Sequence, residues 1–97
     1  DKGLVVILGC AHRGMINTLR HFQNLTGEER IYCVLGGTHL IAASEEWLAQ
    51  AAADLREIGV SRLGVSHCTG FRGASWLAAQ FPEAFFPFNA GSSILLP

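Results

Sequence analysis

Apolar residues occur along this chain in two patterns that alternate with one another. Two uninterrupted apolar runs, Leu4 to Leu8 and Ile31 to Leu35, have the length and the β-branched composition of strands that are buried on both faces. A third segment of similar length, Arg62 to Ser66, follows later in the chain. The pattern therefore predicts two buried strands and a third short strand.

Between these strands, apolar residues recur at helical spacings. The first such segment repeats every three residues, at Ile16, Leu19 and Phe22. In the second, Ser44 is a suitable N-cap, two glutamates occupy the first turn, and the apolar face ends at Gly59, which is typical of a helix C-terminus. A third helix is predicted from about Gly70 to Gln80, with Pro82 marking its end.

The chain changes character again after the third helix. Residues 84–97 contain a polar segment, Asn89 to Ser93, between apolar residues, and this predicts two short strands around a turn. The complete predicted order is β-α-β-α-β-α-β-β. Alternation of this kind favours an α/β fold with a largely parallel sheet.

The size and composition suit one small domain with an unusually apolar surface. Of the 97 residues, 49% are hydrophobic and 15% are charged, which is rich in apolar residues for so small a soluble domain. We therefore expect another chain or a missing segment to cover part of the surface. The sequence begins at Asp1 rather than Met, which indicates a cloned segment, a processed product or a fragment.

Charge and motif content exclude several classes of partner. No apolar run approaches the roughly 20 residues that a membrane span requires. The formal charge of −1, with seven basic residues scattered singly, offers no surface for nucleic acid or an anionic membrane. The glycine-rich dinucleotide and P-loop motifs are also absent from the sequence. We expect a soluble chain with no nucleic-acid partner and no membrane partner.

The three cysteines are Cys10, Cys33 and Cys68. Their odd number and the lack of a CxxC spacing argue against a disulfide framework and against a thiolate zinc site. A reducing cytoplasm fits this usage. We interpret Cys33 as a core residue and the other two as small buried hydrophobic residues at strand ends.

Three of the four histidines occupy equivalent positions, in the loops after the predicted strands. His12 and His39 are 27 residues apart, and His39 and His67 are 28 residues apart. The carboxyl ends of parallel strands share one sheet edge, so these imidazoles can meet there and form an open zinc site of catalytic type. The alternative is that each is an ordinary turn or capping residue. His21 lies inside the first helix, where we expect it to face solvent.

Two arginines follow the strand-end histidines. Arg13 and Arg72 each lie near the start of a predicted helix. An anion bound there would interact with a guanidinium group and with the helix N-terminus. The pattern therefore predicts a site for an anionic group, with two solvated surface arginines as the alternative interpretation.

Three short motifs together resemble a known family: GCAHRG at 9–14, GGTHL at 36–40 and HCTG at 67–70. They resemble the C-terminal half of a metallo-β-lactamase-superfamily hydrolase, in the branch that includes the dihydropterin–ribofuranosylaminobenzene-phosphate synthases. The resemblance extends over essentially all 97 residues. It implies that the chain is the β-α-β-α-β-α-β-β half of an αββα sandwich, in which metal ligands from both halves meet at one sheet edge.

The resemblance also implies roles for individual residues. His12 matches the histidine of the family's GCxH motif, and His67 matches its last metal-binding histidine. His39 stands where many relatives have an aspartate that bridges two metals, so it would bind either metal or substrate. The candidates for binding a small anionic substrate are Arg13, Thr69 and Arg72.

One family motif, HxHxDH, is absent from this sequence. By the resemblance it would precede residue 1 and supply the first metal ligands, so we expect a divalent metal, zinc with iron or manganese as alternatives, only together with the N-terminal half. The chain alone is then expected to be inactive. Its exposed sheet face would bind the missing N-terminal half or a second copy of the chain, as a homo-oligomer. The alternative function is a non-catalytic half-domain that binds a small anion or a protein.

Overall fold

The computed structural model describes residues 2–97. Over this range the chain forms β1 (Leu4–Leu8), α1 (Met15–Thr26), β2 (Ile31–Gly37), α2 (Glu45–Ile58), β3 (Arg62–Ser66), the short 3₁₀ helix η1 (His67–Thr69), α3 (Gly70–Gln80) and β4 (Phe85–Pro87). The predicted alternation of strands and helices is confirmed as far as β4. Within the same range no helix combines the length and the apolar character that crossing a membrane requires.

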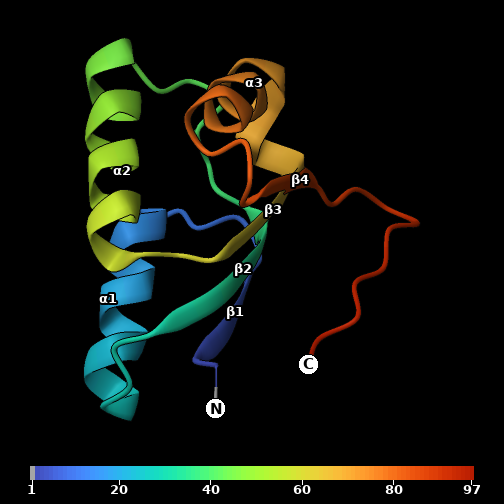
Figure 1. Ribbon diagram of the computed structural model, residues 1–97. Coiled ribbons are helices and arrows are strands. Elements are labelled where there is room, and N and C mark those ends of the chain that lie inside the picture. The colour runs from blue at the N-terminus through green and yellow to red at the C-terminus, as the bar shows by residue number, and fades with distance from the viewer. Residues whose placement is uncertain (1) are drawn as a thin grey trace.

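The strands of residues 2–97 form one parallel sheet in the order β1-β2-β3-β4. Each strand is added on the same side of the previous one, and each connection passes through a helix. Right-handed crossovers in such a sheet place every helix on the same face. Figure 1 shows α1 and α2 together on one side of the sheet. The opposite face therefore has no helical layer among the described elements.

The core lies between the sheet and these helices. The sheet contributes Val6, Leu8, Val34, Leu63 and Val65, and the helices contribute Met15, Leu19, Leu48, Leu55 and Leu77. Leu19 and Leu77 have no exposed surface. In β1 and β3 these residues come from alternate positions, so both strands contribute one face to this core. In β2 the successive residues Cys33, Val34 and Leu35 are all buried, so the predicted burial on both faces is confirmed for this strand.

The ends of α2 follow the sequence prediction. Ser44 Oγ accepts a hydrogen bond from the Trp47 backbone N–H at 3.1 Å. Glu45 and Glu46 lie in the first turn, where carboxylates interact favourably with the helix dipole. Gly59 ends the helix in the left-handed conformation, with a φ of 78°. The helix boundaries are thus set by local sequence signals.

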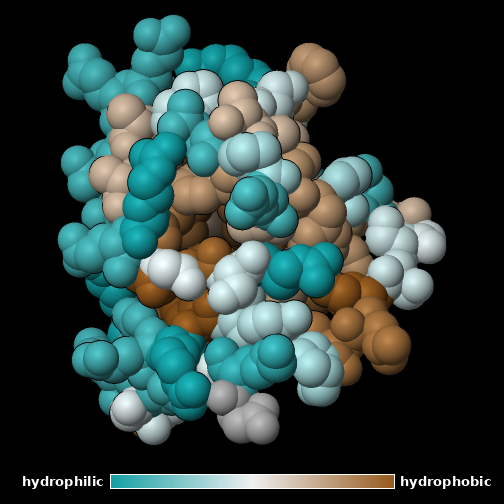
Figure 2. Space-filling model, viewed as in Figure 1, coloured by the Kyte–Doolittle hydropathy of each residue, from teal (hydrophilic) through white to brown (hydrophobic). Residues whose placement is uncertain are grey.

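β1 is buried on one face only, so the prediction of burial on both faces is wrong for this strand. Val6 and Leu8 are buried in the core, whereas Val5 is 38% exposed and Ile7 is 77% exposed. The cause is the strand order, which places the crossover helices on one side and puts β1 at the sheet edge. Apolar side chains reach the surface in several places, including the side on which the C-terminal tail lies (Figures 1 and 2).

The predicted second strand after β4 does not form; residues 88–97 contain no strand. The expected turn is present, because the Ser92 N–H donates to the Asn89 carbonyl at 3.0 Å. The tail runs outward from β4 and then turns back on the side of the sheet opposite α1 and α2 (Figure 1), and Leu95 is 94% exposed. Pro87 ends β4, and since proline has no N–H to donate, it limits further pairing at this edge.

Candidate functional site

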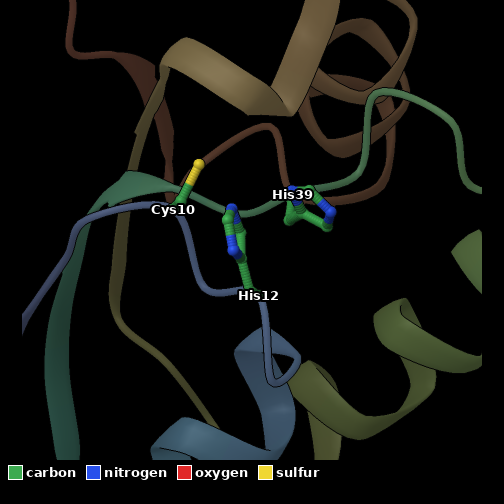
Figure 3. Close-up of side chains that lie close together, drawn as sticks. All are labelled: Cys10, His12 and His39. Atoms are coloured by element: carbon green, nitrogen blue, oxygen red, sulfur yellow. The ribbon is translucent and has the colours of Figure 1, made fainter.

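The loops after β1, β2 and β3 carry the GCAHRG, GGTHL and HCTG motifs to one edge of the sheet. The His12 and His39 rings lie 4.7 Å apart between centroids, with an interplanar angle of 52°. Figure 3 shows these two rings beside the Cys10 side chain, with His39 coming from a different loop. The structure therefore brings together two of the three predicted ligands directly.

His67 lies at the same edge of the sheet, where it contacts Cys10. The Cys10 Sγ lies 3.2 Å from His67 Nε2. Within residues 2–97, Cys10 belongs to two groups of candidate metal ligands, one with His12 and His39 and the other with His67 and Cys68. In each group the ligand atoms lie within 4.8 Å of one another. All three predicted histidines are thus arranged around one cysteine.

The site contains backbone conformations that side chains rarely adopt. Among the described residues, the non-glycine residues with positive φ are Ala11 at 58°, His39 at 56° and His67 at 57°. The left-handed region costs a non-glycine residue about 1–2 kcal/mol. Such residues are concentrated at functional sites, where the surrounding structure holds them in place. Here all of them lie in the three strand-end loops.

Gly37 lets residues from β1 and β3 meet across the end of β2. A side chain at position 37 would start 2.6 Å from the Gly9 carbonyl oxygen and 2.8 Å from the Cys68 Sγ. Strands two places apart are separated by about 9.6 Å, so their side chains meet only if little stands between them. The second glycine of GGTHL therefore makes room for the contact between Cys10 and Cys68.

Thr69 is a buried structural link between the loops after β2 and β3. Its hydroxyl accepts hydrogen bonds from the Thr38 hydroxyl at 2.8 Å and the Thr38 N–H at 3.2 Å. It donates to the Ser66 carbonyl at 2.9 Å. Thr69 is 1% exposed. A substrate contact for Thr69 stays a prediction, and the structure already gives its hydroxyl three partners.

The two predicted anion-binding arginines occupy different places. Arg13 lines a cavity of about 370 Å³ together with His12 and His39. Arg72 is exposed and donates to the Ala43 carbonyl at 2.5 Å. Arg13 is thus beside the histidines, whereas Arg72 is bonded to the loop that precedes α2.

Cys10 and Cys68 are the site residues that sequence reasoning missed, because we interpreted them as buried hydrophobic residues. Both are half-buried, and their Sγ atoms lie 3.3 Å apart. Hydrogen bonding with Cys68 raises the pKa of the Cys10 thiol, and partial desolvation and the charge of Cys68 act in the same direction. The available signal was position, since each cysteine lies within two residues of a strand-end histidine.

The sequence interpretations of His21 as a solvent-facing residue and of Cys33 as a core residue are confirmed. His21 is exposed on α1, and Cys33 is fully buried in β2. Burial raises the pKa of the Cys33 thiol, which keeps it protonated. Neither residue takes part in the two candidate ligand groups.

The donor atoms of the site fit a divalent transition metal. Imidazole nitrogen and cysteine sulfur are the ligands that zinc prefers, and imidazole also suits iron. Neither ligand group within residues 2–97 includes Asp or Glu. The site thus fits a metal by ligand type, but it lacks the carboxylates that a two-metal centre typically uses.

Comparison with known proteins identifies relatives that are longer than this chain; no protein-family model matches it. A 7,8-dihydropterin-6-methyl-4-(beta-D-ribofuranosyl)-aminobenzene-5'-phosphate synthase from Methanocaldococcus jannaschii is 33% identical over 94 residues, which cover 97% of this chain and 32% of the relative. An uncharacterized protein of the same organism is 31% identical over 74 residues, covering 76% of this chain and 27% of that protein.

A solved structure matches the fold as well as the sequence. The crystal structure of a metal-dependent hydrolase of the β-lactamase superfamily has a TM-score of 0.91 and 33% sequence identity. The match covers 99% of this chain and 37% of that hydrolase. The chain therefore spans about a third of the length of the proteins that it resembles.

Proposed function

We propose that this chain, which resembles the metallo-β-lactamase superfamily in sequence and in fold, supplies part of the metal centre of a metal-dependent hydrolase. The observation that carries the proposal is the grouping of His12, His39 and His67 around Cys10 at the carboxyl edge of the sheet. Open α/β sheets place their ligands at this edge.

The three histidines would hold a divalent metal, zinc with iron or manganese as alternatives. When bound, such a metal acts as a Lewis acid and lowers the pKa of a bound water to about 7. The chain's own residues orient the imidazoles through the strained loops and present Arg13 on the adjoining cavity. The Arg13 guanidinium would bind the anionic group of a small substrate.

The uncovered face of the sheet is the proposed place for the rest of the protein. Ile7 and Val5 expose apolar surface there. By the superfamily resemblance, an N-terminal half with the HxHxDH motif would cover this face and complete the ligand set. A second copy of the chain is the alternative occupant, and we expect the chain by itself to be inactive. The cysteines of residues 2–97 are free of disulfides, which is compatible with a cytoplasmic location.

Metal analysis of the full-length protein, which includes the N-terminal half, tests the assignment. His12→Ala and His67→Ala should each lower the metal content per chain, measured by inductively coupled plasma mass spectrometry. His21→Ala, which removes an exposed histidine from α1, is the matched control and should leave the metal content unchanged. Unchanged metal content in both site variants would refute the ligand assignment.

A non-catalytic half-domain is the second candidate function. The observation that favours it is the lack of carboxylates in either ligand group of residues 2–97. Reading the coding sequence upstream of Asp1 separates the two candidates. An HxHxDH motif there supports the hydrolase, and its absence together with metal-free protein supports the binding module.

A further inference from the structure

Cys10, His67 and Cys68 form a group whose geometry is close to that of a metal site. The Cys10 Sγ lies 3.2 Å from His67 Nε2 and 3.3 Å from Cys68 Sγ. In a tetrahedral zinc site, a sulfur and a nitrogen ligand are about 3.6 Å apart and two sulfur ligands about 3.8 Å apart. The side chains therefore need to separate by less than about half an ångström to accept such an ion.

The surrounding backbone supports a thiolate at Cys68. The His39 backbone N–H donates to the Cys68 Sγ at 3.2 Å. In the metal-free chain the Cys68 thiol donates to the Cys10 carbonyl oxygen at 3.2 Å, a bond that favours the neutral thiol and is lost when a cation replaces the proton. An N–H donor stabilises a negatively charged sulfur, and a cation that replaces the thiol proton leaves this donor in place.

The thiols also supply charge that the histidines lack. Imidazole binds metals as a neutral ligand, so His12, His39 and His67 leave the charge of a dication uncompensated. Neither ligand group of residues 2–97 contains a carboxylate. Two thiolates neutralise a dication, which is important because both cysteines are half-buried.

We propose that Cys10, Cys68 and His67 form a thiolate-bearing site for a borderline or soft divalent cation such as Zn²⁺, and that this chain binds the cation without any other segment. Binding releases two thiol protons to solvent and forms two metal–sulfur bonds and one metal–nitrogen bond, with no change of oxidation state. This site rests in part on the proposed function, because His67 belongs both to the three histidines of the proposed hydrolase centre and to this group with the two cysteines.

Titration with Co²⁺ tests this site without reference to activity. We expect the reduced, metal-free chain to develop the near-ultraviolet sulfur-to-cobalt charge-transfer absorption, saturating at one equivalent of Co²⁺. Cys10→Ala and Cys68→Ala should each remove about half of this band per bound Co²⁺ and weaken Co²⁺ binding by at least about tenfold, and the double variant should lack the band. Cys33→Ala removes the buried cysteine of β2 and is the matched control, which should retain the band.

Several outcomes would overturn the proposal. Co²⁺ absorption without the sulfur band, unchanged in Cys10→Ala but lost in His12→Ala, excludes the thiolate site and leaves the proposed hydrolase centre intact. A folded chain that binds no Co²⁺, or one that keeps a Cys10–Cys68 disulfide in excess thiol reductant, excludes it as well. Circular dichroism checks the fold of each variant, and Cys10→Ser replaces Cys10→Ala if the latter fails to fold.

Discussion

The His12 and His39 rings lie 4.7 Å apart although the residues come from loops after different strands. Their strands, β1 and β2, are parallel neighbours, so both loops leave the sheet at the same edge. The approach involves backbone strain, because Ala11, directly before His12, and His39 itself have left-handed φ values. The loops that position these rings are therefore less stable than loops with glycine at the same positions would be.

Replacing Ala11 with glycine should stabilise the chain. Ala11→Gly removes the left-handed strain of about 1–2 kcal/mol, partly offset by the greater freedom of glycine in the unfolded chain. We expect a gain of up to about 1 kcal/mol in the free energy of unfolding, measured by urea titration. Ala53→Gly, at an exposed position inside α2, is the control and should lose about 1 kcal/mol. A loss at Ala11 as well would contradict the strain argument.

The Thr38–Thr69 pair should be sensitive to loss of the hydroxyl. Thr69→Val leaves the Thr38 N–H without its buried acceptor and should lower the free energy of unfolding by about 1–3 kcal/mol. Thr69→Ser keeps the hydroxyl and should lose clearly less. Urea titration of both variants measures the difference. Equal losses would indicate that Thr69 acts through packing rather than through its hydrogen bonds.

Two glycines near the site should respond differently to substitution. In Gly37→Ala the added methyl would clash with the Gly9 carbonyl and the Cys68 sulfur, which should cost about 1–3 kcal/mol in unfolding free energy and separate Cys68 from Cys10. A side chain at Gly9 meets no atom within 4 Å, so Gly9→Ala should change stability by less than about 0.5 kcal/mol. Equal stability of the two variants in urea would contradict the role assigned to Gly37.

The repeat in the sequence predicted the alternating elements, and the meeting of His12 with His39 was predicted on the assumption that their strands are neighbours. Both follow from the periodicity of apolar residues and from the common edge of parallel strands. The contact between Cys10 and Cys68 could not be read in this way, because the residues are 58 positions apart and meet only across the end of β2. It depends on the missing side chain of Gly37, whose role is visible only in three dimensions.

The local sequence pattern also could not predict which face of β1 is buried. The run Leu4 to Leu8 is uniformly apolar, and such a run is compatible with burial on both faces. Which face stays open is decided by the strand order, since β1-β2-β3-β4 places the crossover helices on one side. Val5 and Ile7 lie on the open face. They belong to the apolar surface that, from the composition, we expected another chain or a missing segment to cover.

This open face should make the isolated chain associate. Ile7 is 77% exposed, and exposed apolar surfaces of this kind mark sites of interaction. We expect a two-fold dimer at tens of micromolar, in which two sheets cover each other, measured as mass by light scattering. Ile7→Lys places a charge in that contact and should shift the mass to the monomer. Leu25→Lys, at a 69% exposed position on α1, should leave the dimer intact. A monomeric unmodified chain would refute the prediction, and an equal response of the two variants would place the contact elsewhere.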